Sequence, residues 1–161
     1  MSPAMSLRGL ARVSLDLEDY AEARRLYQAC LEICEGNNDH WGVVRCLDSL
    51  GFISLYLEEH SEARTKLEKG IRISKETGDH WGMAWCLMDF GFLKLIRKEY
   101  EEAQQVLEEC LTTCKKIGDW QGIATTLSYQ ALVAVGRGEY QEARLIYQRE
   151  IASWQELGYQ L

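Results

Sequence analysis

The sequence repeats itself with a period of 40 residues, in four copies and without a slip. A fixed period of about 20–50 residues is typical of stacked repeat units, which excludes most globular architectures. One such unit cannot bury its apolar side chains alone, so neighbouring units have to close the core. The clearest columns are Glu22, Glu62, Glu102 and Glu142; Ala23, Ala63, Ala103 and Ala143; and Leu7, Leu47, Leu87 and Leu127.

Within each period, apolar residues have helical spacing in two segments separated by short polar breaks. Gly78-Asp79 and Gly118-Asp119 supply a glycine for the left-handed end of one helix and an aspartate to cap the next. This pattern predicts an all-α chain of four antiparallel helix pairs. The predicted helices span 3–17, 20–35, 40–57, 61–76, 80–97, 101–116, 120–137 and 141–157. We treat 1–161 as one array, with repeats at approximately 1–37, 38–77, 78–117 and 118–158.

Two further columns predict how closely the paired helices approach. One column is small, with Ala11, Gly51, Gly91 and Ala131, and the other is large and apolar, with Tyr27, Leu67, Leu107 and Tyr147. A small residue on the first helix lets the second helix come near, while the large residue fills the space behind.

Charge and hydropathy exclude several partners. The 161 residues carry a formal net charge of −7, which argues against binding nucleic acid. The apolar stretches are far shorter than the ~20 residues that a membrane span needs. The first residues lack the basic and apolar regions of a signal peptide. We therefore expect a cytoplasmic protein that binds neither nucleic acid nor membrane.

The six cysteines occupy equivalent positions of the repeat. Cys46 and Cys86 are 40 residues apart, and Cys30 with Cys110 and Cys34 with Cys114 are 80 apart. They have apolar neighbours, and no histidine recurs at a spacing that would complete a zinc site. We expect buried, reduced thiols that pack as small apolar residues, with no metal and no cofactor.

The order of the columns resembles the tetratricopeptide repeat (TPR) family. The matching residues are Leu50-Gly51, His60, Ala63 and Leu67, repeated as Phe90-Gly91, Tyr100, Ala103 and Leu107. The period is longer than the usual 34 residues, and no proline closes the second helix. Such long repeats are similar to those of kinesin light chains, cell-polarity adaptors and bacterial STAND-type regulators. The resemblance implies a TPR-like solenoid, a right-handed α-α superhelix.

The resemblance also implies a binding surface. In the TPR family the first helix of each pair lines a concave groove that receives a peptide or helix. The positions carried over as partner-binding are Arg12, Arg45, Asp48, Phe52, Tyr56, Trp85, Met88, Asp89, Phe92, Tyr129 and Leu132. Neighbouring groove positions are Arg8, Leu15, Ser49, Leu55, Leu95, Ile96, Thr125, Ser128 and Val135. We expect Phe52, Phe92 and Leu132 to form an apolar ladder.

No phosphate loop, nucleophile elbow or paired-carboxylate motif stands out, so we expect no enzyme activity. The preferred function is a non-catalytic interaction module that binds a protein or peptide ligand as the sensor or scaffold part of a larger signalling protein.

Two alternatives remain. One is a structural relay that acts on a neighbouring catalytic or DNA-binding domain, and we expect the junction residues Trp41 and Trp81 to lie in the core rather than at an interdomain contact. The other is self-association through exposed array ends, where Ile146, Ile151 and Trp154 would form an apolar patch.

Overall fold

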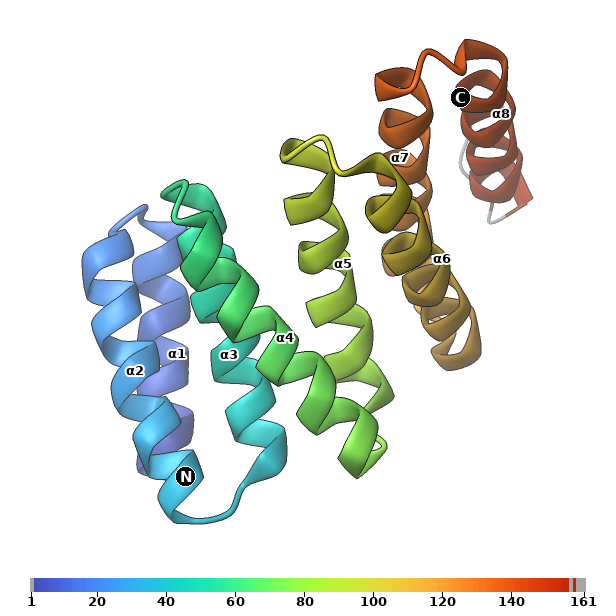
Figure 1. The fold of residues 1–161 in the computed structure, drawn as a ribbon. Coiled ribbons are helices and arrows are strands. Elements are labelled where there is room, and N and C mark those ends of the chain that lie inside the picture. Colours follow the sequence, from blue (N-terminus) through green and yellow to red (C-terminus); the bar gives the residue numbers. More distant parts are fainter. Residues whose placement is uncertain (1, 157, 159–161) are drawn as a thin grey trace.

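The computed structural model describes residues 2–156 and 158, and within them the chain forms eight helices and no strand. The helices follow one another as antiparallel pairs along an elongated array, with the first and last helices at opposite ends (Figure 1). Their bounds are α1 Pro3–Asp16, α2 Tyr20–Gly36, α3 His40–Tyr56, α4 His60–Thr77, α5 His80–Ile96, α6 Tyr100–Ile117, α7 Trp120–Gly136 and α8 Tyr140–Glu156. The predicted all-α class is confirmed. The predicted helix ends agree to within one residue, except that the predicted end at 157 lies outside the described residues.

Aspartate caps begin the first helices of the later pairs, as the sequence predicts. The side chains of Asp39, Asp79 and Asp119 each accept a hydrogen bond from the backbone N–H three residues later, at 2.9 Å. Gly78 and Gly118 end α4 and α6 with positive φ angles of 71° and 72°. These glycines allow the left-handed turn that an L side chain disfavours.

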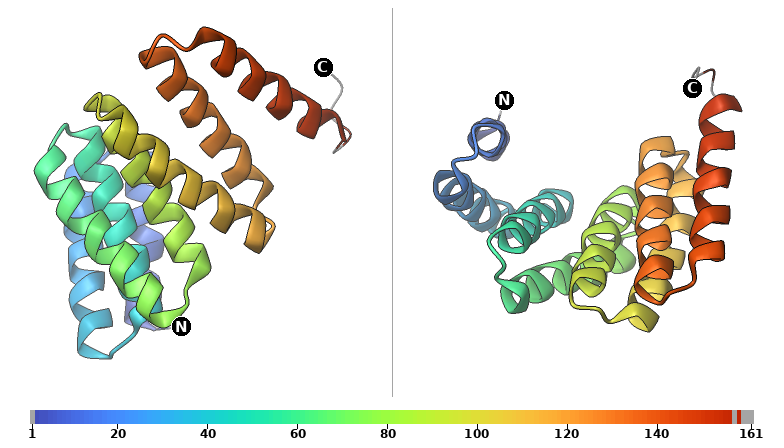
Figure 2. Two further views of the ribbon diagram at one scale, coloured as in Figure 1. Left: turned by 45° about the vertical axis from the view of Figure 1, so that its right-hand side comes forward. Right: turned by 90° about the horizontal axis from the view of Figure 1, so that it is seen from above.

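Two layers of helices make up the array. Each helix packs against the next one in sequence, and α5 also contacts both α3 and α7. The inner layer therefore consists of α1, α3, α5 and α7, and the outer layer of α2, α4, α6 and α8. Viewed from above, the pairs follow an arc that opens between the two ends of the chain (Figure 2).

The small and large columns meet inside the hairpins, which confirms the predicted close approach. A Cβ atom added to Gly51 would lie 2.7 Å from the Leu67 side chain, and one added to Gly91 would lie 2.5 Å from Leu107. Leu67 and Leu107 are fully buried. The helices of the two central pairs are therefore as close as these glycines permit.

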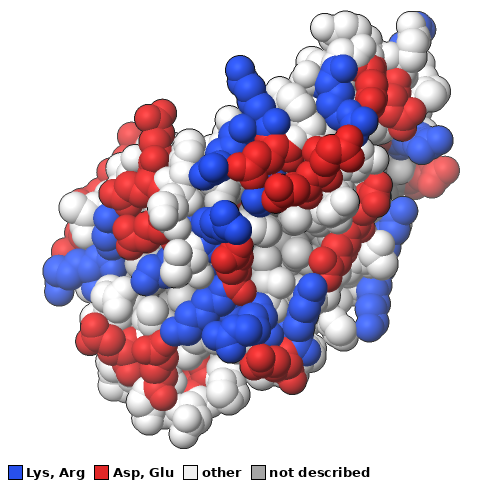
Figure 3. Space-filling model, viewed as in Figure 1, with Lys and Arg blue, Asp and Glu red and all other residues white. Residues whose placement is uncertain are grey.

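Charged side chains of both signs are interspersed on the face that carries α2, α4 and α6 (Figure 3). Some join neighbouring outer helices: Lys69 Nζ lies 2.8 Å from Glu35 Oε1, and Lys75 Nζ lies 2.7 Å from Glu109 Oε1. Each such exposed pair contributes only about 0–1 kcal/mol to stability. The buried columns, rather than these pairs, hold the repeats together. Among the described residues, none of the helices has the length and apolar character required to cross a membrane.

Gly91→Val tests the helix contact. The new side chain has no room beside Leu107, so we expect a loss of about 1–3 kcal/mol in the free energy of unfolding, measured by urea denaturation. Gly9→Val is the matched control, because Gly9 is also helical but a Cβ atom added to it would meet no atom within 4 Å. Equal effects of the two substitutions would contradict this account of the packing.

Candidate functional site

Two adjoining hollows lie along the inner layer between α1, α3 and α5. Their volumes are about 430 and 620 Å³, and they share the residues Arg12, Tyr27, Asp48, Ser49 and Asp89. We call the combined surface the inner groove. Its lining residues are Met5, Arg8, Gly9, Arg12, Leu15, Asp16, Glu18, Tyr20, Tyr27, Trp41, Arg45, Asp48, Ser49, Phe52, Trp85, Met88 and Asp89.

The inner groove brings together most of the residues predicted to bind a partner. The predicted residues that line it are Arg12, Arg45, Asp48, Phe52, Trp85, Met88 and Asp89. Tyr56, Phe92, Tyr129 and Leu132 lie outside the two hollows. Tyr56 stacks on Tyr20 with ring centroids 4.4 Å apart, and Phe92 stacks on Tyr129 at 5.1 Å. The binding role of all eleven residues stays a prediction.

The predicted apolar ladder is uneven. Phe52 and Leu132 are each 43% exposed, whereas Phe92 is half-buried beneath Tyr129. Leu55, predicted to face the groove, is buried in the core with Ala63 and Leu93, so that prediction is wrong. The error arises because Leu55 lies on the side of α3 that packs against its neighbours.

The junction tryptophans also differ from expectation. The sequence predicts Trp41 and Trp81 in the core, but they are 50% and 46% exposed. Both lie in the first turn of an inner helix, at a junction open to solvent. Trp41 lies under two arginines, with the guanidinium carbons of Arg8 and Arg45 at 4.6 and 5.0 Å from its ring centroid. The recurrence of Trp-Gly at the junctions is the available sequence signal for this part of the groove.

The apolar patch expected at the C-terminal end is smaller than predicted. Ile146 is buried, because it packs on the inner side of α8, so its predicted exposure is wrong. Ile151 is 47% exposed and Trp154 is half-buried.

Arg45 is anchored in the groove wall. Its side chain is only 6% exposed, and Nη2 donates to Asp79 Oδ1 and Oδ2 at 3.0 and 2.8 Å. The guanidinium carbon lies 4.1 Å from the Trp85 ring centroid, opposite Trp41. Ion pairing and cation–π attraction together fix this side chain. Arg45 therefore joins α3 to the capped start of α5.

Asp48 and Asp89 form a carboxyl pair in the groove. Oδ1 of Asp48 is buried without a hydrogen-bond partner. Burial raises the pKa of Asp48 to about 7, although Arg45 opposes the rise. Burial, and then the charge of Asp48, raise the pKa of Asp89 well above its ordinary value. The two carboxyls therefore titrate as an interacting pair that resists carrying two negative charges.

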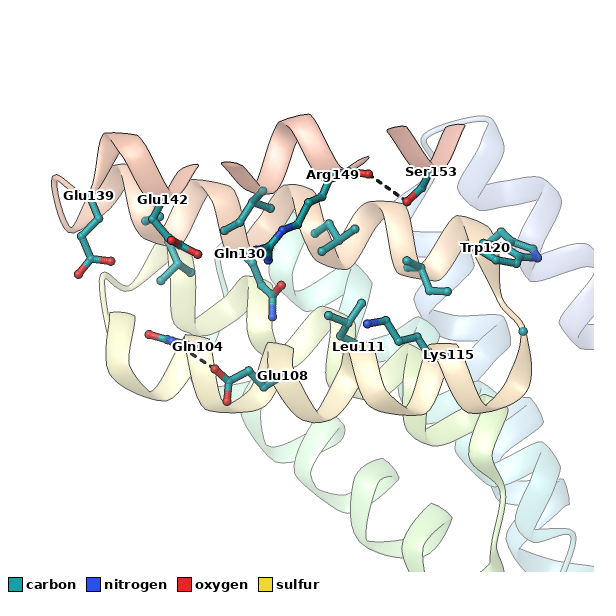
Figure 4. Close-up of a pocket in the computed structure, with 16 residues that line it drawn as sticks. Gln104, Glu108, Leu111, Lys115, Trp120, Gln130, Glu139, Glu142, Arg149 and Ser153 are labelled. Atoms are coloured by element: carbon teal, nitrogen blue, oxygen red, sulfur yellow. Dashed lines mark hydrogen bonds between the residues drawn. The ribbon is translucent and has the colours of Figure 1, made fainter. Parts of the chain in front are cut away.

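A further hollow of about 640 Å³ lies between α6, α7 and α8. Figure 4 shows Glu139 and Glu142 at one end and Trp120 at the other. Some of the polar groups in this hollow form hydrogen bonds with one another. Gln104 donates to Glu108 at 3.2 Å, and the Ser153 hydroxyl donates to the Arg149 carbonyl at 3.0 Å (Figure 4). None of the residues predicted to bind a partner lines it, so the inner groove is the stronger candidate.

All six cysteines are buried, as expected, and none of them is joined in a disulfide. The thiols of Cys30, Cys34 and Cys46 lie close together, which the spacing along the chain did not predict.

The tetratricopeptide repeat family model matches residues 2–76 and 82–156. The chain therefore belongs to the tetratricopeptide repeat family. The repeats define a protein-interaction scaffold, a class that is generally non-catalytic. No curated protein sequence matches the chain significantly.

Solved structures share the fold at low sequence identity. BtubC from P. vanneervenii has a TM-score of 0.84 and 17% identity, over 98% of this chain and 66% of BtubC. A Rap protein complexed with Competence and Sporulation Factor has a TM-score of 0.86 and 18% identity, over 95% of this chain and 43% of the Rap chain. Kinesin light chain TPR-like repeats of Podosopora anserina have a TM-score of 0.73 and 17% identity, over 99% of this chain and 79% of theirs. The chain thus spans less than two thirds of the length of BtubC and of the Rap protein.

Two aspartate substitutions separate the ion pair from helix capping. Asp79→Ala removes a cap and leaves the buried Arg45 guanidinium without its carboxylate, so we expect a loss of about 3–5 kcal/mol in unfolding free energy. Asp119→Ala removes only the equivalent cap, because Trp85 stands in the column of Arg45, and should cost about 1 kcal/mol. Thermal and urea unfolding measure both. Equal losses would show that the ion pair adds nothing.

Asp48→Asn tests the buried carboxyl. The folded pKa of about 7 exceeds the ordinary 3.8, so the folded chain binds this proton more tightly than the unfolded chain. Stability should therefore fall as the pH rises from about 4 to 7, and the amide should remove that fall. We expect the variant to be more stable than the parent by up to about 4 kcal/mol at pH 8 and nearly equal to it at acid pH.

Urea denaturation at pH 5 and pH 8 measures this difference. Glu32→Gln, on the exposed side of α2, is the matched control and should leave the pH dependence unchanged. A lower stability of Asp48→Asn at pH 8 would contradict the assignment.

Proposed function

We propose that this chain is a non-catalytic binding module, the scaffold part of a larger signalling protein, whose inner groove holds an extended peptide segment of a partner. In this proposal a basic side chain of the peptide enters beside Asp48 and Asp89. Apolar peptide side chains on either side pack against the exposed groove aromatics.

The charge arrangement of the groove carries the proposal. Its arginines already have charged or aromatic neighbours: Arg45 pairs with Asp79 through Nη2, Arg12 lies 3.4 Å from Asp16, and Arg8 lies over Trp41. Nε and Nη1 of Arg45 are buried without a hydrogen-bond partner. Among the described residues, no ion pair reaches Asp48 or Asp89. A cation supplied by a ligand would reduce the repulsion between the two carboxyls. It would also stabilise their negative charge, which water does less well where they are buried.

The apolar part of the groove supports a peptide rather than a small ion. Met5, Phe52 and Trp85 are 52%, 43% and 37% exposed around the carboxyl pair. Covering one ligand side chain of Leu or Phe size contributes about 1.5–3 kcal/mol before ordering costs. In protein interfaces a few residues supply most of the binding free energy, and rigid aromatic residues such as Trp85 are common among them.

A structural neighbour is consistent with this proposal. The Rap protein with the same fold was solved in complex with Competence and Sporulation Factor, so a scaffold of this shape can hold a partner. At this low sequence identity, the similarity to the Rap protein concerns the fold alone. The chemical class of the proposed ligand is therefore inferred from the groove residues of this chain.

The test uses short fluorescent peptides of alternating Leu and Ser that differ only in a central Lys or Glu. Fluorescence anisotropy should show that the Lys peptide binds about tenfold more tightly than the Glu peptide. The double substitution Asp48→Asn with Asp89→Asn should remove this preference, whereas Glu32→Gln should keep it. Phe52→Asp, at an exposed aromatic residue of the inner groove, should weaken both peptides.

Two results would overturn the proposal. One is equal binding of the Lys and Glu peptides by the parent chain. The other is a preference for Lys that survives in the double asparagine variant. If no peptide binds at millimolar concentration, the relay alternative is favoured, in which the array acts on a neighbouring domain of the same protein.

A further inference from the structure

Three cysteine thiols converge between the first two helix pairs. Cys30 and Cys34 lie one turn apart on α2, and Cys46 comes from α3. Their sulfur atoms all lie within 4.8 Å of one another, and Cys30 Sγ is 4.0 Å from Cys34 Sγ. Each of the three side chains is at most 1% exposed. The cluster is separate from the inner groove, whose lining includes none of the three.

The spacing of the sulfurs suits an ion held by three thiolates. Three sulfurs at about 2.3 Å from a central ion lie about 4.0 Å apart when the ion is in their plane, and about 3.5 Å apart around a pyramidal centre such as trivalent arsenic. The sulfurs of Cys30 and Cys34 are 4.0 Å apart and every pair lies within 4.8 Å, so side-chain shifts of about 1 Å close the cluster around such a centre. Sulfur donors select soft ions over hard ones. No carboxylate or imidazole of the described residues joins the three sulfurs within 4.8 Å, so the site offers three ligands rather than four.

We propose that Cys30, Cys34 and Cys46 form a binding site for a soft, thiophilic ion that accepts three sulfur ligands. The buried surroundings favour the ion that leaves the least charge, because an unpaired charge is costly in a protein core. Trivalent arsenic meets this condition: arsenous acid, As(OH)₃, and three thiols give three As–S bonds and three water molecules. No electron is transferred, and the product is neutral. Cu(I) shares the preference for sulfur but leaves two negative charges on three thiolates.

Two of the three thiols, those of Cys34 and Cys46, hold their protons tightly before an ion arrives, which fits this exchange. Burial is the main cause that raises the pKa of Cys34 to about 11, and burial also raises the pKa of Cys46. A reaction that releases water avoids forming free thiolates in the core.

The path to the cluster leads past α1. The Cys30 thiol donates to the Ala4 carbonyl at 3.2 Å, so the first turn of α1 covers this sulfur. Helix α1 packs mainly on α2. Local opening of a helix with so few neighbours is cheaper than global unfolding, and it would admit a small ion.

The chain contains its own comparison site. Eighty residues further on, Cys110 and Cys114 have the same 4.0 Å separation, but Thr126 stands in the column of Cys46. Its hydroxyl lies 3.3 Å from Cys110 Sγ. In the intervening repeat the same positions are Gly70, Ser74 and Cys86. The fold thus accommodates threonine where the third thiol would be, and only the first of these three sites has all three sulfurs.

Arsenite binding, followed by intact-mass spectrometry under native conditions, tests the proposal. The parent chain should bind one arsenic, and Cys46→Thr, which copies the Cys110 site, should bind at least tenfold more weakly. Thr126→Cys should create a second site and bind two. The same measurement is repeated with Cu(I) and with Zn(II). Cu(I) should bind more weakly than arsenite, and Zn(II) should bind weakest of the three because it prefers four ligands.

Each outcome bears on the proposal. A parent chain that binds no arsenic overturns it, and so does a Cys46→Thr variant that binds as tightly as the parent. Zn(II) binding tighter than both other ions would overturn the three-coordinate assignment. Thr126→Cys gains a function, so its result does not depend on a variant that merely fails to fold. Circular dichroism of each variant is the control that tests whether its helices are folded.

Discussion

The close contact between a glycine and a leucine within each central hairpin is the constraint on which the rest of this structure depends. Gly51 admits the Leu67 side chain, and Gly91 admits Leu107, at distances that leave no room for a Cβ atom. This contact brings the outer helix against the inner one and buries the apolar columns between them. Because the outer two hairpins have Ala11 and Ala131 at the same position, every repeat keeps a small residue there, and the hairpins stack to leave a continuous inner face.

On that inner face, one ion pair serves both stability and the groove. Asp79 caps α5 and also holds Arg45, whose guanidinium lies between two tryptophan rings. Arg45 is therefore committed to the scaffold, although it lines the groove. Because Arg45 pairs with Asp79, it does not pair with Asp48. Asp48 is partly shielded from water and has no ion-pair partner among the described residues. A buried carboxyl in this position costs stability, and such a cost is typical of a residue that serves binding.

The cysteine cluster shows how a packing position can acquire chemistry. On α4 to α7 the columns that hold Cys30, Cys34 and Cys46 carry glycine, serine, threonine or cysteine, whereas α8 has Glu150 and Trp154 in the columns of Cys30 and Cys34. Packing alone therefore does not distinguish these residues. Three thiols together differ from any other combination, because only sulfur atoms at this separation can share a soft ion.

The sequence by itself determined the all-α class, the helix ends, the aspartate caps and the glycine–leucine contact, because each follows from short-range spacing that the 40-residue period repeats. It also selected most of the groove residues through the columns of the first helices. It did not determine the burial of Leu55 and Ile146 or the exposure of Trp41 and Trp81, since these depend on how far each helix is rotated against its neighbours. Only the tertiary structure placed Arg45 on Asp79, left Asp48 and Asp89 without an ion-pair partner among the described residues and gathered three thiols from two helices. Contacts between separate helices are fixed by packing in three dimensions, and the linear pattern of one helix does not contain them.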